Sequence, residues 1–157
     1  MKRKIIIALS VVVSAVVFAF GLTACKSSAV LDNFDRHNVD TRLLKDYKIV
    51  CDIKGETFTG RANSYGVLAF KSEPTAFLQS FSTDKSDGFS SEKNEEFEHR
   101  IDTYFSDLKI PSKYCPDWNE DYIWYVSGGF DKIYYLDTLF MIYFPNNLEL
   151  VVCETGH

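Results

Sequence analysis

The C-terminal stretch Leu139–Glu154, LFMIYFPNNLELVVCE, decides the fold. Its two apolar runs, Leu139–Phe144 and Leu148–Glu154, have the length of strands and are separated by the turn-favouring residues Pro145-Asn146-Asn147. They predict two antiparallel strands joined by a short turn. Because successive side chains of a strand point to opposite faces, Leu139–Phe144 is hydrophobic on both faces.

Further strands are expected upstream, where β-prone residues lie between turn residues. These strands are predicted at Tyr47–Ile53, Val67–Phe70, Tyr122–Ser127 and Lys132–Leu136, with turns at 54–56, 63–66 and 128–129.

Helices are predicted between the two groups of strands and before the first. The clearest is Glu92–Leu108, which has an apolar stripe at helical spacing and Ser91 as an available N-cap. Shorter helical segments are expected within Val30–Asp46 and from Pro74 through Phe81. The sequence therefore predicts one α+β domain over residues 30–157, an antiparallel sheet with helices packed on one face.

The first 25 residues form an export signal of a particular kind. Lys2, Arg3 and Lys4 precede an apolar run from Ile5 to Phe20, which is the layout of a secretory signal peptide. The stretch Leu22-Thr23-Ala24-Cys25 that follows resembles the lipobox of bacterial lipoproteins.

That resemblance implies a lipid anchor. Cys25 is expected to carry a diacylglyceryl thioether, residues 1–24 to be removed as the signal peptide, and residues 25–29 to form a short tether. Two acyl chains give stable membrane attachment, which one chain does not. The folded domain is then held at the cell membrane, facing outside the cytoplasm. An uncleaved transmembrane helix and an ordinary cleaved signal with an unmodified Cys25 stay open as alternatives.

The charge balance bears on the partners. The 157 residues carry a formal charge of −5, with 17 basic and 22 acidic residues. Because Lys2, Arg3 and Lys4 leave with the leader, 14 basic residues remain and the mature chain carries −8. This acidity argues against a nucleic-acid partner and leaves membrane attachment to the lipid.

Three cysteines remain after lipidation of Cys25. An exported protein is in a setting where disulfides persist, and the sequence predicts a Cys51–Cys153 pair, with three unpaired thiols as the alternative. A nucleophilic Cys115 would need a nearby histidine base, and the spacing selects none of His37, His99 and His157.

No cofactor or metal site is predicted. Glu96 and His99 have the Glu-x-x-His spacing of di-iron bundles, but the motif occurs once where two are needed. The loops 84–88 and 117–121 are acidic but depart from the calcium-loop pattern. Nucleotide-binding and common hydrolase motifs are absent from the sequence.

Aromatic residues are dense between Trp118 and Phe144. One helical layer covers one face of a sheet, so part of this aromatic surface is expected to be available to a glycan, a peptide or an envelope protein. The candidate ligand-binding residues are Trp118, Tyr122, Trp124 and Tyr125. Cross-strand aromatic packing is the alternative.

The favoured function is therefore that of a lipid-anchored, non-enzymatic domain that binds a ligand or an envelope partner through its aromatic-rich sheet. The alternatives are an envelope enzyme, hydrolase-like with an unidentified site, and a structural or assembly lipoprotein.

Overall fold

The domain is built on one five-stranded antiparallel sheet. The computed structural model describes residues 28–56, 62–81, 88–129 and 137–156. The strands follow one another in the sheet in the order β1-β2-β5-β4-β3. Their bounds are Tyr47–Glu56 (β1), Ala62–Phe70 (β2), Ile123–Val126 (β3), Thr138–Phe144 (β4) and Glu149–Thr155 (β5). The α+β class predicted from the sequence is confirmed.

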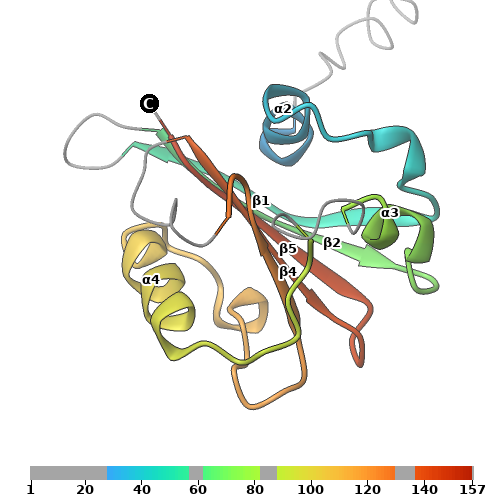
Figure 1. Cartoon of the computed structure of the whole chain (residues 1–157). Coiled ribbons are helices and arrows are strands. Elements are labelled where there is room, and N and C mark those ends of the chain that lie inside the picture. The colour runs from blue at the N-terminus through green and yellow to red at the C-terminus, as the bar shows by residue number, and fades with distance from the viewer. Residues whose placement is uncertain (1–27, 57–61, 82–87, 130–136, 157) are drawn as a thin grey trace, which may run out of the picture.

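Helices cover both faces of this sheet (Figure 1). The helices and short 3₁₀ segments are Ala29–Arg36 (α2), Thr41–Leu43 (η1), Thr75–Gln79 (α3), Glu95–Phe105 (α4) and Ser112–Tyr114 (η2). Helix α4 packs on one face, and α2 and α3 pack on the other. The prediction that all helices lie on one face is wrong.

Helices are needed on both faces because of the composition of the central strands. Every residue of β4 is buried, so both faces of that strand need an apolar cover. Phe140 and Ile142 face Phe97 and Ile101 of α4. Leu139, Met141 and Tyr143 belong to the opposite core, which also contains Val30, Phe34 and Phe77.

The turns predicted at 54–56 and 63–66 lie instead within strands β1 and β2. The polar residues of β2 find partners on the two helical layers: Asn63 donates to the carbonyl of Tyr104 (3.1 Å), and Ser64 accepts from Asn33 (2.7 Å). Long-range contacts therefore override the local turn preference.

Helix α4 begins at Glu95, three residues later than predicted. The Asn94 side chain accepts hydrogen bonds from the backbone N–H groups of Glu96 and Phe97, both at 3.0 Å, so Asn94 and not Ser91 is the N-cap. The helical segment predicted in Val30–Asp46 resolves into α2 and η1, separated by Asn38 at φ 54°.

Some predictions concern parts of the chain that the structure does not describe. These are the signal peptide and Cys25, the strand Lys132–Leu136, and most of the acidic loop 84–88. Within the described ranges, none of the helices combines the length and the hydropathy that a membrane crossing requires.

Candidate functional site

The four candidate aromatic residues divide between the two faces of the sheet. Trp118, Tyr122 and Trp124 pack on the α4 side, whereas Tyr125 belongs to the core under α2 and α3. The alternation of side chains along β3 explains why Trp124 and Tyr125 point in opposite directions. They therefore do not form one continuous surface.

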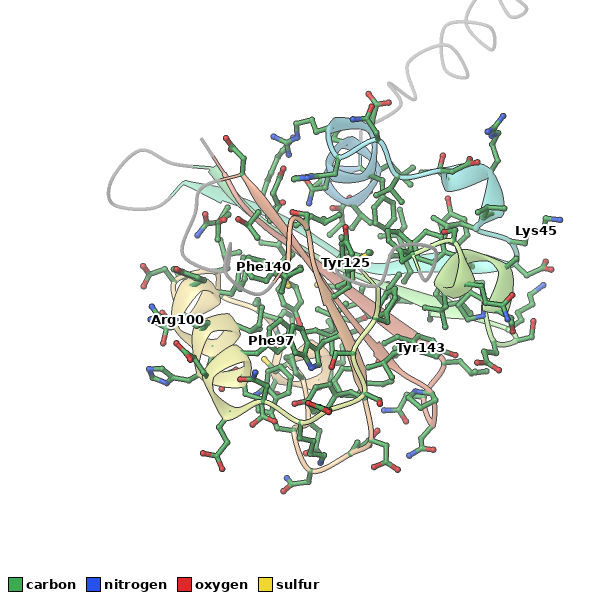
Figure 2. All side chains as sticks on the ribbon, viewed as in Figure 1. Lys45, Phe97, Arg100, Tyr125, Phe140 and Tyr143 are labelled. Carbon is green, nitrogen blue, oxygen red and sulfur yellow. The ribbon has the colours of Figure 1, made fainter. Side chains whose placement is uncertain are left out.

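On the α4 side, the rings are occupied in holding the helix to the sheet. Trp124 stacks on Phe97 with ring centroids 4.6 Å apart, and Figure 2 shows Phe97 between α4 and the sheet. The polar tips have protein partners: the indole N–H of Trp118 donates to Asp102 (3.1 Å), that of Trp124 to the carbonyl of Glu92 (2.8 Å).

The polar tip of Tyr122 also has a protein partner. Its hydroxyl donates to the Glu98 carboxylate at 2.6 Å. Burial, reinforced by this hydrogen bond, raises the pKa of Tyr122 to about 12. Since Tyr122 and Trp124 are both buried, their rings serve the packing of α4.

The three cysteines in the described part of the chain, Cys51, Cys115 and Cys153, are free thiols, and Cys51 and Cys153 are not brought together. Strand β2 lies between β1 and β5, which carry these two residues. Since neighbouring strands are about 4.8 Å apart, β1 and β5 lie about 10 Å apart, beyond the Cα separation of roughly 7 Å that a disulfide bridges. The structure therefore does not support the predicted Cys51–Cys153 pair.

Cys115 is the exposed thiol of the three. It lies at a cavity of about 160 Å³ between α4 and the η2 segment, whose wall also contains Asp102 and Tyr65. Asp102 is already bonded to Trp118, and the Tyr65 hydroxyl donates to the carbonyl of Tyr114 (2.6 Å). None of the described residues lining this cavity is a histidine, so a base for thiol catalysis is missing from its wall.

The histidines occupy other surroundings. His37 lies on the α2 side, bonded to Glu154 at 2.9 Å, and His99 is exposed on α4. His157 lies outside the described residues. Glu96 faces Arg100 at 4.0 Å, and the described ranges contain no group of three or more potential metal ligands.

A buried polar network joins α2 to the sheet. Glu154 on β5 is 2% exposed, and its carboxylate contacts both the guanidinium of Arg36 and the ring of His37. Arg36 also donates to Asn33 (2.7 Å), which in turn donates to Ser64. Every polar group in this chain of contacts has a partner, so the network stabilises the packing of α2.

The surface under α3 also contains half-buried aromatic rings. The segment before α4 is fixed to β3 by a two-bond bridge, in which Ser90 and Trp124 exchange backbone hydrogen bonds of 2.8 and 2.9 Å. This bridge extends the sheet locally and places Phe89 on the same face as Ile123 and Tyr125.

Phe89, Phe81 and Tyr125 form a cluster of half-buried rings, here called the aromatic triad. The ring centroids lie 4.9 Å (Phe81–Tyr125), 5.5 Å (Phe81–Phe89) and 5.7 Å (Phe89–Tyr125) apart. Phe81 also meets the fully buried Phe77 of α3 edge to face at 5.1 Å. The triad is therefore anchored on its inner side and open on its outer side.

A cavity of about 240 Å³ adjoins the triad and shares Phe89 with it. This cavity is here called the α3 pocket. Its wall combines apolar and hydrogen-bonding side chains: Glu73, Thr75, Leu78, Gln79, Phe89 and Ile123. A few polar groups on an apolar wall are typical of ligand sites, and this volume is below the roughly 300–1,000 Å³ of drug-sized ligands.

The hydroxyl of Tyr143 is an unusual feature of the core on this face of the sheet. Tyr143 is 1% exposed, and its hydroxyl oxygen has no hydrogen-bond partner within the described structure. Burial, followed by the negative charge of Glu73, raises the pKa of Tyr143. Tyr143 pairs with Ile123 across the β3–β4 ladder. Tyr143 belongs to the core on the α3 side of the sheet, but it is not among the residues that line the α3 pocket.

Sequence reasoning found one member of this site, Tyr125, and missed the rest. The polar residues of α3 carry no motif, and Phe89 reaches Tyr125 only through the bridge at Ser90. Comparisons of this chain with protein-family models, with curated proteins and with solved structures return no match. The chemistry of the α3 pocket must therefore be argued from its own residues.

Proposed function

We propose that this chain is a lipid-anchored extracytoplasmic protein whose α+β domain binds a ligand or an envelope partner at the α3 pocket and the aromatic triad. The observation that carries the proposal is the coincidence of half-buried rings and a polar-rimmed cavity on one face of the sheet.

The location rests on the leader. Lys2, Arg3 and Lys4, the apolar run and Leu22-Thr23-Ala24-Cys25 stand in the order of a lipoprotein signal. Helix α2 begins at Ala29, and the Ser28 side chain accepts from the N–H of Leu31 (3.5 Å) as its N-cap. Since an extended residue spans about 3.5 Å, a lipid on Cys25 would hold the start of α2 within about 15 Å of the bilayer.

The anchor is tested by labelling cells with a fatty-acid probe. We expect the protein to be labelled, the label to be lost in Cys25→Ala, and the mature N-terminus to be position 25. A matched Cys115→Ala variant should keep the label. A label that survives Cys25→Ala would overturn the anchor.

Binding is tested by placing a photo-crosslinking amino acid at Gln79, which is exposed on the rim of the α3 pocket. The control position is Asp107, which is exposed beyond the end of α4. We expect discrete crosslinked products from position 79 that are absent from position 107 and are lost when Phe89→Ser is added. Identical products from both positions, or products unaffected by Phe89→Ser, would reject binding at this pocket.

A further inference from the structure

The geometry points to a second copy of this chain as the partner of the outer edge of β1, paired antiparallel around Ile53. Strand β1 has one neighbour in the sheet, β2, so its other edge presents backbone N–H and C=O groups outward. Within the described ranges, no further backbone segment hydrogen-bonds to that edge. Such an edge can accept another strand, and a second copy supplies one of the same length.

The two edges of the sheet are protected to different degrees. At the other edge, β3 is four residues long, and the Ser90–Trp124 bridge covers part of it. Strand β1 is ten residues long, and its register to β2 shifts at Val50, which forms a bulge. Because a bulge bends and twists a strand, regular pairing on the outer edge is confined to residues 51–56, which follow it.

The side chains of residues 51–56 alternate between the two faces of the sheet. Cys51 and Ile53 pack in the core on the α4 side. The Lys54 ammonium reaches the Asp32 carboxylate of α2 at 3.2 Å, so Lys54 points to the α2 side, and so does Asp52, two residues earlier. Asp52 is exposed and the Lys54 side chain is 56% exposed, so both charges can meet a partner strand.

These charges select the register of the pair. A twofold axis perpendicular to the sheet joins the two β1 edges antiparallel, and directly opposite residues then share a face. An axis through Asp52 would set two carboxylates opposite each other, and an axis through Lys54 two ammonium groups, both of which are unfavourable. An axis through Ile53 sets each Asp52 opposite the partner's Lys54 and brings the two Ile53 side chains together.

The contacts already made within one copy are compatible with this pair. The Lys54 ammonium has three N–H donors, so it can keep Asp32 while it meets the second carboxylate. Because the axis is perpendicular to the sheet, both copies of α2 lie on the same side of the joined sheet. Two of the proposed lipid anchors could then enter one membrane, although the pairing itself does not depend on the anchor.

The test measures the mass of the full chain in a neutral detergent by light scattering, over about 5 to 200 µM. We expect a monomer–dimer equilibrium with a Kd of roughly 10–100 µM, because one pair of short strands forms a small interface. Asp52→Lys places a lysine opposite the partner's Lys54, and Lys54→Glu places a glutamate opposite the partner's Asp52. Each variant alone is expected to weaken dimerisation at least about tenfold.

An equimolar mixture of the two variants shows whether the charges face each other. In a mixed pair both cross-strand contacts join opposite charges again, so dimers are expected to return to within about threefold of the original affinity. Asp107→Lys and Lys109→Glu make the same charge changes at exposed positions beyond the end of α4 and should leave the affinity unchanged. Urea unfolding curves of all variants check the fold, which substitutions at exposed positions are expected to preserve.

A chain that stays monomeric up to about 200 µM would reject the second copy and leave the edge to an extended segment of another protein. Dimers that are indifferent to Asp52→Lys and to Lys54→Glu form through another surface, which would overturn the assignment of β1. Dimers that are lost in both folded variants and do not return in their mixture would show that the two charges do not face each other, and the register around Ile53 would be wrong.

Discussion

Gly66 of β2 lies directly against Val30 of α2. A methyl group added to Gly66 would overlap Cγ2 of Val30 and approach the carbonyl oxygen of Cys51 to 3.2 Å. Val30 is fully buried, so helix and strand meet here with no space between them. The absent side chain at position 66 is thus what allows the first helix to dock on the sheet.

Gly66→Ala is therefore expected to lower the free energy of unfolding by about 1–3 kcal/mol, as overpacking of a core does. Val30 is fully buried and its β-branched side chain is restricted at χ1, so we expect α2 itself to shift. Urea unfolding of the full chain in neutral detergent measures the change.

Gly55→Ala is the matched comparison. Its added methyl would meet Cδ2 of Leu108, the far end of a flexible side chain, so a smaller loss of stability is expected. A loss for Gly66→Ala no greater than that for Gly55→Ala would contradict the role assigned to the contact with Val30.

Glu154→Gln is expected to lower the free energy of unfolding by roughly 1–3 kcal/mol, because the buried acceptor of the Arg36 guanidinium and the His37 ring loses its charge. Glu154 is 2% exposed, while Arg36 is 40% exposed, so water takes over part of the lost interaction with Arg36. Asp40→Asn removes the carboxylate of the solvent-exposed pair with Arg42 and should leave the unfolding curve unchanged. Equal effects of the two variants would show that the Glu154 network does not hold α2.

The thiols are expected to differ strongly in reactivity. Burial raises the pKa of Cys51 and raises that of Cys153 well above its usual value, whereas Cys115 is exposed. Since the thiolate is the reactive form, Cys115 should be alkylated by iodoacetamide at least roughly ten times faster than the other two. Mass mapping of a time course gives the rates, and denaturant should make the three equal. Rapid labelling of Cys51 in the native protein would show that β1 opens more readily than its packing implies.

The sequence predicts best the parts whose signal is local. The β4–β5 hairpin follows from two apolar runs and Pro145-Asn146-Asn147, and the turn at Gly128 and Gly129 from residues that accept φ values of 75° and 85°. The turn predicted at 63–66 fails, because the partners that keep Asn63, Ser64 and Gly66 in a strand lie on other elements.

In the candidate site too, the sequence predicts local features and misses contacts between distant segments. Tyr125 was identified from aromatic density, yet its neighbours Phe81 and Phe89 were not, because they meet it through the fold and not through spacing along the chain. The prediction of helices on one face was wrong, although the sequence of β4 contradicts it. A strand that is apolar on both faces needs helices or other elements packed on each face. Once both covers are in place, Tyr122 and Trp124 are buried, whereas Phe81, Phe89 and Tyr125 on the α3 side are half-buried.

A last prediction concerns pH. Glu149 at the start of β5 is half-buried, and burial, with a smaller contribution from the charge of Glu120, raises its pKa. The folded state therefore binds this proton more tightly than the unfolded state, so the contribution of Glu149 to stability falls as the pH rises above its ordinary pKa of 4.5. Below that value both states are protonated and the effect vanishes. Glu149→Gln should accordingly raise the unfolding midpoint in urea at pH 7 and leave it almost unchanged at pH 4, while Glu95→Gln on exposed α4 raises it at neither. A gain of the same size at both pH values would mean that the amide improves packing, and that the ionisation of Glu149 costs no stability.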